Sequence, residues 1–258
     1  MGLFDLPHVL YMVISALLTA GGLVAAAYLC KTQRQKDFLL RFFAIITVII
    51  HYSNLWVDYF TTGTAELENN HLLPVYPCNI VMWLLLIAAC IKNRDGIAFK
   101  MIAEFVFWGG VVCGSVGIIF NANYDNTPSL RDYDILKGLV SHSTMLFGCI
   151  YMLVGKYIRI RVFNVVSCIA GLLFFLLDGA IINGLFDHFG IDPVNAMFLQ
   201  EPPLPQFPWM SVWLLGAVAV TLLFGALALY EQKCFPENER WYNQLKNTIQ
   251  KIKEKENV

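Results

Sequence analysis

Charged residues are scarce in this chain of 258 residues, because Asp, Glu, Lys and Arg together make up only 14% of it. A soluble domain holds about 25% charged residues and is about 45–50% apolar, whereas 57% of this chain is hydrophobic. This composition excludes an ordinary soluble domain. The chain also lacks a Gly-rich phosphate loop and a Gly-x-Ser-x-Gly nucleophile elbow. Its charge pattern gives no sign of nucleic-acid binding, so we expect no nucleic-acid partner.

The last long apolar run, residues 209–230, contains no Lys, His or Asp. A retinal Schiff base would need a lysine in that run, so a retinal protein is excluded. The absence of His and Asp disfavours a zinc hydrolase that takes metal ligands from its last helix. We therefore expect a protein that needs no metal and no soluble cofactor.

The chain contains many long apolar runs, and a helix needs about 20 apolar residues to cross a bilayer. We predict an all-α polytopic membrane protein with seven transmembrane helices, at residues 8–29, 38–60, 72–91, 99–120, 137–154, 162–182 and 209–230. These runs form one membrane domain, residues 1–236. The first run lacks a basic flank and is too long for a removable signal peptide.

Residues 237–258 form the predicted tail. The spacing of Trp241, Leu245, Ile249 and Ile252 among Lys and Glu residues is typical of an amphipathic helix on the inner membrane surface. A frayed, solvated tail is the alternative interpretation.

Lys and Arg are distributed unevenly between the two sides of the predicted bundle. Of the 18, only Arg131 and Lys137 fall on one side, and the others lie in residues 30–41, 92–100, 155–161 and the tail. Cytoplasmic loops carry the excess of positive charge in membrane proteins. We therefore predict an external N-terminus and a cytoplasmic C-terminus.

The predicted external loop 183–208 contains five prolines and no Lys or Arg. Because proline fixes φ and cannot continue a helix, we expect a stiff, non-helical cover over the outer face. A plain connector is the alternative.

None of the seven cysteines lies in a predicted external loop, and the chain has no Cys-x-x-Cys pair, so we expect no disulfide framework. Most of them are expected to be small buried hydrophobes. Cys78 differs because it follows Pro77, and proline favours the first turn of a helix. Free backbone N–H groups at that turn would favour the thiolate, the nucleophilic form, whereas apolar surroundings would oppose it. An inert residue behind a proline remains possible.

His142 lies at a similar depth, in the opening turns of the fifth run, between Ser141 and Ser143. A helix N-terminus disfavours imidazolium, and a neutral imidazole can accept a proton from a thiol. Either serine could orient the ring, while a simple packing role is the alternative. Cys78 and His142 are therefore the candidate catalytic pair.

Other polar residues gather at the same predicted outer end, where their cost in hydrocarbon suggests a function. His51, Asn54 and Asp58 share one helical face, and Asp178 and Asn183 lie near the outer end of the sixth run. Asn and Asp also often cap or join helices. We expect the substrate-binding residues to be His51, Asn54, Asp58, Asn79, Asn121, Ser141 and Asp178.

Three short motifs carry a family resemblance over nearly the whole chain: Leu73-Pro74-Val75-Tyr76-Pro77-Cys78-Asn79, His142, and Asn195-Ala196-Met197-Phe198-Leu199 followed by Glu201-Pro202-Pro203. With these, the chain resembles the YwaF-like family of bacterial multi-pass membrane proteins and their eukaryotic relatives, the transmembrane ether-phospholipid acyltransferases. The resemblance implies a cysteine nucleophile and a histidine partner that move a fatty acyl group, here Cys78 and His142. Tyr76 stands where many bacterial members have a histidine.

The resemblance also implies a bacterial cytoplasmic membrane, and a more distant likeness to the androgen-induced type of membrane hydrolase keeps ester hydrolysis open. We therefore predict a lipid acyltransferase or lipid ester hydrolase near the outer leaflet, with membrane phospholipid or lysolipid as its partner. The alternative is a transporter or receptor whose polar outer pocket binds a small solute without covalent chemistry. A structural membrane protein without a ligand is the third interpretation.

Overall fold

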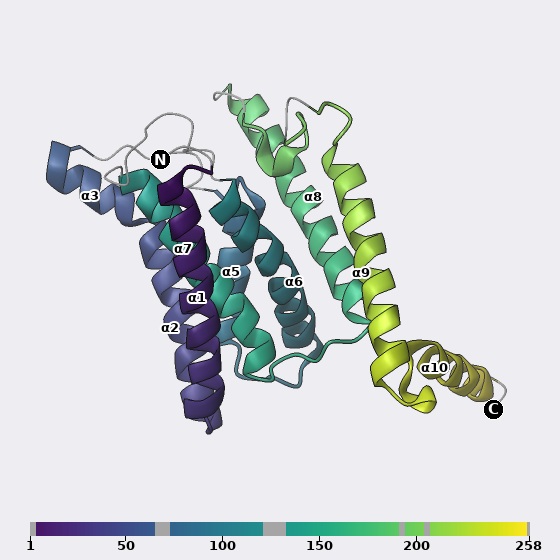
Figure 1. The fold of residues 1–258 in the computed structure, drawn as a ribbon. Helices are drawn as coiled ribbons and strands as arrows, with labels where there is room; N and C mark the ends of the chain where they lie inside the picture. Colours follow the sequence, from purple (N-terminus) through teal and green to yellow (C-terminus); the bar gives the residue numbers. More distant parts are fainter. Residues whose placement is uncertain (1–3, 65–72, 121–132, 191–193, 204–206, 257–258) are drawn as a thin grey trace.

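The computed structural model describes residues 4–64, 73–120, 133–190, 194–203 and 207–256, and this part of the chain is helical, without strands. The long helices lie side by side, the described chain starts at one end of the bundle, and α10 projects sideways at the other end (Figure 1). In order, the elements are α1 (Leu6–Leu29), α2 (Gln33–His51), α3 (Ser53–Thr62), α5 (Pro77–Cys90), α6 (Ile97–Ile119), α7 (Tyr133–Val154), α8 (Asn164–Phe189), the 3-10 turn η2 (Ala196–Phe198), α9 (Val212–Cys234), η3 (Glu237–Glu239) and α10 (Trp241–Glu256).

Six helical segments of the described chain are long and apolar enough to cross a membrane. They are α1, the continuous segment of α2 and α3, α6, α7, α8 and α9. The prediction of a multi-pass helical membrane protein is confirmed at this level. The third predicted run, residues 72–91, yields only the 14-residue α5, because residues 73–76 are not helical and Pro77 opens the helix. By the criteria of length and composition, the described chain therefore has six candidate spans and not the seven that were predicted.

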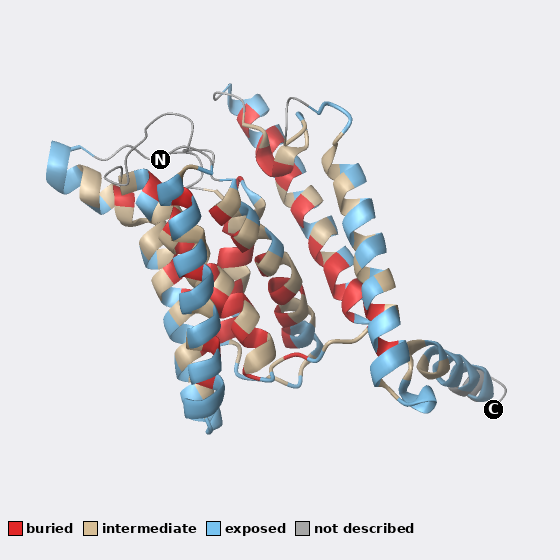
Figure 2. Ribbon diagram, in the orientation of Figure 1, coloured by how far each residue is buried: buried red, intermediate tan, exposed pale blue. Residues whose placement is uncertain are grey.

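The centre of the bundle is formed by α7, which packs against α1, α2, α5 and α6. Buried residues concentrate on the helices of this centre, whereas α1 and α9 are largely exposed (Figure 2). The exposed positions of α1 and α9 include large apolar side chains such as Leu18 and Leu222. An apolar surface of this kind suits lipid contact rather than water.

Close packing of α6 on α7 depends on glycines of α6. A Cβ on Gly110 would lie 2.1 Å from the sulfur of Cys149, and one on Gly117 would lie 2.3 Å from Nε2 of His142. Small residues at helix contacts let two backbones approach closely in a membrane. The α6 glycines therefore leave room for the cysteine and histidine side chains of α7.

Hydroxyl groups join α7 to α1 and α2. Ser143 Oγ lies 2.9 Å from the Tyr11 hydroxyl and 2.8 Å from Ser15 Oγ, while Thr47 donates to Thr144 at 3.0 Å. Because unpaired polar groups are costly in hydrocarbon, such pairs hold helices together. Ser143 is thereby committed to α1 and does not orient His142.

The predicted run 38–60 lies within the single candidate span Gln33–Thr62, but a local break at Tyr52 divides that span into α2 and α3. The Ser53 hydroxyl donates to the carbonyl of Ile50 at 2.6 Å and accepts from the Tyr133 hydroxyl at 2.6 Å. Such back-bonding to the preceding turn bends helices. As a result α3 leans away from the bundle (Figure 1).

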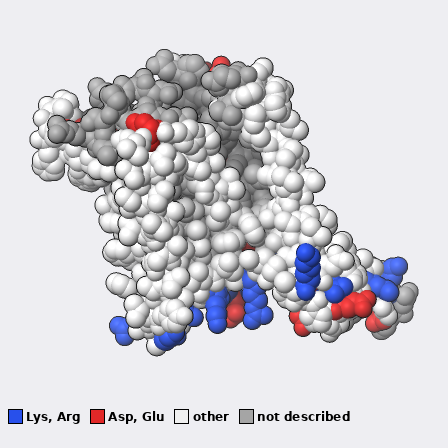
Figure 3. Space-filling view, viewed as in Figure 1, with Lys and Arg blue, Asp and Glu red and all other residues white. Residues whose placement is uncertain are grey.

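Lys and Arg side chains gather at one end of the molecule, called here the Lys/Arg-rich end (Figure 3). At this end Glu231 is fully buried and joins three segments. It accepts from the backbone N–H of Val162 at 2.7 Å and of Trp241 at 2.8 Å, and it pairs with Arg161 at 3.2 Å. These bonds fix the start of α10 against the end of α9.

The sixth predicted run ends too early, because α8 continues from residue 182 to Phe189. The predicted non-helical loop 183–208 is therefore shorter than expected. Its described part contains η2, and the loop begins at Gly190, which has a positive φ of 61° and ends α8. Glycine is favoured at such a helix end because it has no Cβ.

Candidate functional site

Cys78 lies in the first turn of α5, as Pro77 predicts. Tyr76 has the extended backbone of a helix cap, and Pro77 is the first helical residue. The backbone N–H groups of Cys78 and Asn79 interact with the Cys78 sulfur. The half-buried thiol packs against the main hydrophobic core. A sulfur at this place faces the positive end of the helix dipole.

Asn79 connects the start of α5 to His51 at the end of α2. Its Oδ1 accepts from the backbone N–H of Tyr76 at 3.0 Å, and its Nδ2 lies 3.3 Å from Nε2 of His51. Since the amide NH2 can only donate, His51 accepts at Nε2 and is neutral, with its proton on Nδ1. His51 and Asn79, both predicted site residues, therefore form one hydrogen-bonded unit beside Cys78.

The loop 195–199 meets the segment that leads into α5. The backbone N–H of Met197 donates to the carbonyl of Val75 at 2.9 Å. The rings of Tyr76 and Phe198 lie with centroids 5.9 Å apart. Two of the three motifs singled out in the sequence are thus in direct contact.

Asn183 holds the loop 195–199 on α8. Its amide accepts from the backbone N–H of Ala196 at 2.9 Å and donates to the carbonyl of the same residue at 3.3 Å. Met197 and Phe198 have positive φ values of 53° and 56°. Such conformations are unfavourable for residues with a Cβ and persist only where the surroundings impose them. The sequence marked Asn183 only as a polar residue near a helix end.

His142 projects from α7 onto Gly117 of α6. Its Nδ1 lies 2.7 Å from the carbonyl of Gly138, which can only accept, so this nitrogen carries a proton. Ser141 donates to the same carbonyl at 2.9 Å. A backbone carbonyl, and neither neighbouring serine, therefore orients the ring. Nε2 has no hydrogen-bond partner within the described chain and is the free basic atom of a neutral imidazole.

Cys78 and His142 are both placed along α6, but no hydrogen bond joins them within the described chain. The Cys78 thiol is close enough to Cys113 of α6 to interact electrostatically with it. Gly117, which touches His142, follows Cys113 by one helical turn, a rise of about 6 Å. A group held between the two side chains would therefore contact both α5 and α7.

The other predicted site residues are dispersed. Asn54 of α3 and Asp178 of α8 each have one buried oxygen without a hydrogen-bond partner in the described part of the structure. Figure 1 shows α3 and α8 on opposite sides of the molecule, so the two residues do not share a subsite. Asp58 lies half-buried on α3 beyond the break at Tyr52. Asn121 lies outside the described residues.

One buried polar residue was not anticipated from the sequence. His8 is fully buried, accepts at Nδ1 from the backbone N–H of Phe4 at 2.9 Å, and donates from Nε2 to the carbonyl of Ile118 at 3.0 Å. It fixes the start of α1 to the end of α6. The only sequence signal was its place at the start of an apolar run. The described residues hold no cluster of three or more His, Cys, Asp or Glu side chains suited to a metal ion.

Comparison with known proteins identifies a family for the chain. No curated protein and no solved structure matches it significantly. The model of the TMEM164 family matches residues 3–230, a range that includes Cys78, His142 and the loop 195–199. Because the match covers most of the chain and all but the last turn of the candidate spans, the protein belongs to the TMEM164 family.

Proposed function

We propose that the protein is a membrane-embedded lipid acyltransferase or lipid ester hydrolase, with Cys78 as nucleophile and His142 as base. The observation that carries this proposal is that the loop 195–199 and the start of α5 meet beside Cys78. The loop 195–199 is locked onto residues 73–76 just before the thiol, and backbone N–H groups face the sulfur. The resemblance to YwaF-like proteins and ether-phospholipid acyltransferases rests on these same segments.

The reaction begins when Nε2 of His142 takes the proton of the Cys78 thiol. The thiolate then attacks the carbonyl carbon of a lipid ester, and a tetrahedral oxyanion forms. The N–H of Asn79 already donates to the carbonyl of Tyr76 at 2.9 Å, so in this proposal the backbone N–H of Cys78 stabilises that oxyanion. The C–O bond breaks, the lysolipid oxygen takes the proton from His142, and an acyl thioester remains on Cys78.

The second half of the reaction regenerates the enzyme. His142 takes a proton from a lysolipid hydroxyl, or from water, as that oxygen attacks the thioester carbonyl. The C–S bond breaks, and the thiolate recovers its proton from His142. A lysolipid acceptor gives acyl transfer, and water gives hydrolysis. The contacts of Cys78 with Cys113 and of His142 with Gly117, one turn further along α6, support an ester group held between the two side chains.

A buried acceptor without a partner suits a lipid headgroup that donates hydrogen bonds. Asp178 has such an oxygen on α8, the helix that holds the loop 195–199, whereas the oxygen of Asn54 lies on α3 at the opposite side of the molecule. His51 and Asn79 already bond each other and are better placed to position the start of α5 than to bind substrate directly. We propose a membrane phospholipid or lysolipid as the partner, with its acyl chain between helices and its headgroup near the loop 195–203.

We further propose that α5 makes a seventh crossing, completed by the non-helical residues 73–76. The described chain starts and ends at opposite ends of the bundle (Figure 1), which agrees with an odd number of crossings. The Lys/Arg-rich end would then be cytoplasmic by the positive-inside rule, with the tail, residues 237–258, lying on that membrane surface. A bacterial cytoplasmic membrane is the proposed location. Cysteine accessibility to a membrane-impermeant maleimide, read at Cys234, tests the orientation.

The catalytic proposal is tested by intact-mass and peptide analysis of purified protein incubated with mixed phospholipids. We expect a hydroxylamine-sensitive acyl adduct on Cys78 that is absent in Cys78→Ser and strongly reduced in His142→Ala. Cys168→Ser, which removes a buried thiol of α8, serves as the matched control and should keep the adduct. Intact lipid esters in the presence of a folded wild-type protein would overturn the proposal.

A solute-binding receptor or transporter is the second candidate, and the unpartnered buried oxygen of Asn54 is the observation that favours it. This acceptor could bind a small polar solute without covalent chemistry. The two functions differ in their dependence on the thiol. Cys78→Ser abolishes acyl turnover if the protein is the enzyme but leaves solute binding intact if it is the receptor.

A further inference from the structure

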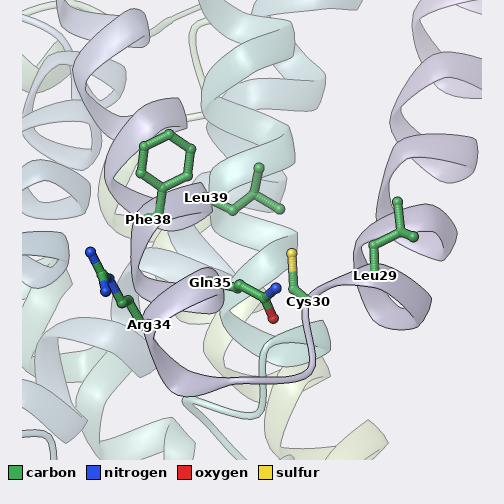
Figure 4. Close-up of a pocket in the computed structure, with 6 residues that line it drawn as sticks. All are labelled: Leu29, Cys30, Arg34, Gln35, Phe38 and Leu39. Atoms are coloured by element: carbon green, nitrogen blue, oxygen red, sulfur yellow. The ribbon is translucent and has the colours of Figure 1, made fainter.

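Two adjoining pockets lie at the Lys/Arg-rich end, away from Cys78 and His142, and they share Cys30. The first has a volume of about 450 Å³ and lies between the end of α1 and the start of α2. Figure 4 shows its lining, in which Cys30 and Leu39 face each other across the gap between the two helices. Apart from Cys30, its lining residues are Leu29, Arg34, Gln35, Phe38 and Leu39.

Most of the surface of the first pocket is apolar and lies where lipid would cover it. Leu29 and Phe38 are 72% and 69% exposed in the protein alone. Exposed apolar side chains at the end of a membrane helix contact acyl chains rather than water. The first pocket is thus a groove suited to a hydrocarbon chain, with Arg34 at its polar border.

The second pocket has a volume of about 250 Å³ and lies between the α1–α2 connection and the end of α7. Lys31, Lys36 and Lys156 all line it, and no acidic residue does. Tyr151 also lines it, and its buried hydroxyl has the weakly accepting Cys30 thiol beside it but no oxygen or nitrogen partner within the described residues. Three cations around one small cavity, with a hydroxyl whose only neighbour is a weak sulfur acceptor, favour an anion.

The lysines of the second pocket are not neutralised by the protein. Neither Lys36 nor Lys156 has an ion pair or side-chain hydrogen bond in the described chain. The Lys31 ammonium donates to the carbonyl of Ala27 and lies 5.6 Å from the centre of the Tyr28 ring, but it has no carboxylate partner in this part of the structure. The nearby carboxylate of Asp37 is engaged elsewhere, because it accepts from Arg94 at 3.2 Å and from Tyr157 at 2.7 Å. The positive charge of the pocket therefore remains available to a ligand.

Lys156 occupies a backbone position where glycine would be more favourable for folding. Its φ is +66°, in the left-handed region, just after the end of α7. Glycine is the usual residue at such a helix terminus because a Cβ is strained there. A lysine with this backbone conformation places a cation at the pocket despite that strain.

We propose that the two pockets together form a binding site for an anionic phospholipid of the adjacent leaflet. Its phosphate would lie among Lys31, Lys36 and Lys156, with the Tyr151 hydroxyl as a further donor. One acyl chain would follow the apolar groove beside Leu29 and Phe38. The site would attach the α1–α2 connection and the end of α7 to one lipid, independently of the proposed reaction at Cys78.

The experiment is native mass spectrometry of the full chain, purified in dodecyl maltoside and titrated with dioleoylphosphatidylglycerol or dioleoylphosphatidylcholine. We expect the wild-type protein to retain the anionic lipid in clear preference to the zwitterionic one. Loss of one lysine should weaken phosphatidylglycerol binding about fivefold, the effect of about 1 kcal/mol per basic residue at a membrane surface. Lys36→Ala and Lys156→Gly are the test variants, and Tyr151→Phe should give a similar loss.

Lys156→Gly keeps the proposal testable even if Lys36→Ala unfolds, because glycine suits the backbone of that position. Lys100→Ala is the matched control, since Lys100 is an exposed lysine near the start of α6 that lines neither pocket. Equal retention of the two lipids would overturn the proposal, as would an equal loss in Lys100→Ala. Displacement of phosphatidylglycerol by equimolar glycerol 3-phosphate would also overturn it, because the site would then recognise a free phosphate.

Discussion

The backbone N–H of Met197 donates to the carbonyl of Val75 across 2.9 Å and thereby joins a loop that follows α8 to the residues that lead into Cys78. The two residues are 122 positions apart in the sequence. Through this bond and the Asn183 amide, α8 and α5 share one anchored loop. The position of the thiol should therefore depend on how tightly α8 holds the loop.

Gly179→Ala should loosen the loop 195–199. A Cβ on Gly179 would lie 2.9 Å from the carbonyl oxygen of Ala196 and 2.9 Å from the Cβ of Met197. The loop must shift to relieve this overlap, at a cost of about 1–3 kcal/mol in the free energy of unfolding. Thermal unfolding in detergent measures the loss, and limited proteolysis should cut the loop 195–203 faster than in the wild type.

Gly184→Ala is the matched control for that variant, because it lies on the same helix and its new Cβ would meet no atom within 4 Å. Replacing glycine by alanine in an open helix position stabilises by up to about 1 kcal/mol. If Gly179→Ala and Gly184→Ala unfolded at the same temperature, the anchoring role of α8 would be wrong.

Gly117 and His142 should show energetic coupling. A Cβ on Gly117 would lie 2.1 Å from Cδ2 of the His142 ring, so Gly117→Ala must displace either the ring or α6. We expect a destabilisation of about 1–3 kcal/mol and a loss of the acyl adduct on Cys78. In a His142→Ala background the same substitution should be almost neutral, because the overlapping ring is gone.

A double-mutant cycle on thermal stability measures this coupling, for which residues in contact give about 0.5–3 kcal/mol. Gly21→Ala on α1, with no atom within 4 Å of its new Cβ, should be additive with His142→Ala. Additivity between Gly117→Ala and His142→Ala would mean that the ring does not rest on Gly117 in the protein.

Ionisation of the Tyr157 phenol should lower the free energy of unfolding at alkaline pH. Burial raises the pKa of this phenol well above its ordinary value of 10.0, and its hydrogen bond to Asp37 raises it further. A group with a raised pKa in the folded state stabilises the protein below its unfolded pKa, and that stability declines as the pH rises above it. We therefore expect the wild-type protein to lose stability above about pH 10.

Tyr157→Phe isolates this effect. The variant should be less stable than the wild type at neutral pH, because Asp37 loses a donor at 2.7 Å. The difference between the two proteins should shrink as the pH rises above about 10. Unfolding temperatures from pH 7 to pH 11 provide the measurement, and a constant difference over that range would contradict the role given to the phenol.

The sequence predicted those features that depend on local patterns. Apolar run length indicated the membrane helices, and Pro77 indicated that Cys78 would lie in a first helical turn. The break at Tyr52 was missed because no proline marks it; it depends on the Ser53 hydroxyl and on Tyr133 from a distant helix. The short α5 was missed because mean hydropathy does not show where an apolar but non-helical segment stops.

The site itself was only partly predictable, for a similar reason. Residue type and predicted depth selected Cys78, His142 and His51. The partners that position them are backbone groups and an amide: Gly138 for His142, and Asn79 for His51. Backbone carbonyls carry no sequence signal, and the contact of the loop 195–199 with residues 73–76 depends on how α8 packs. Local patterns therefore identified reactive groups, whereas long-range packing decides their surroundings.

Glu231 should be the most sensitive position at the Lys/Arg-rich end. Its fully buried carboxylate accepts two backbone N–H groups and pairs with Arg161. Glu231→Ala leaves these donors and a cation without their partner, and removal of one member of a buried pair costs about 3–5 kcal/mol. We expect a large fall in unfolding temperature, together with release of α10, seen as faster proteolysis after Arg240.

Glu239→Gln is the control, because Glu239 is 53% exposed and lies 3.9 Å from the same guanidinium. Exposed pairs contribute about 0–1 kcal/mol, so this variant should unfold close to the wild-type temperature. Glu231 links the end of α9 to the start of α10 by accepting from backbone N–H groups. Glu231→Gln should therefore recover only part of the stability that Glu231→Ala loses, because its amide oxygen still accepts a hydrogen bond but carries no charge to pair with Arg161. Equal stability of Glu231→Ala and Glu239→Gln would show that charge at this end, and not the buried junction, fixes the tail helix.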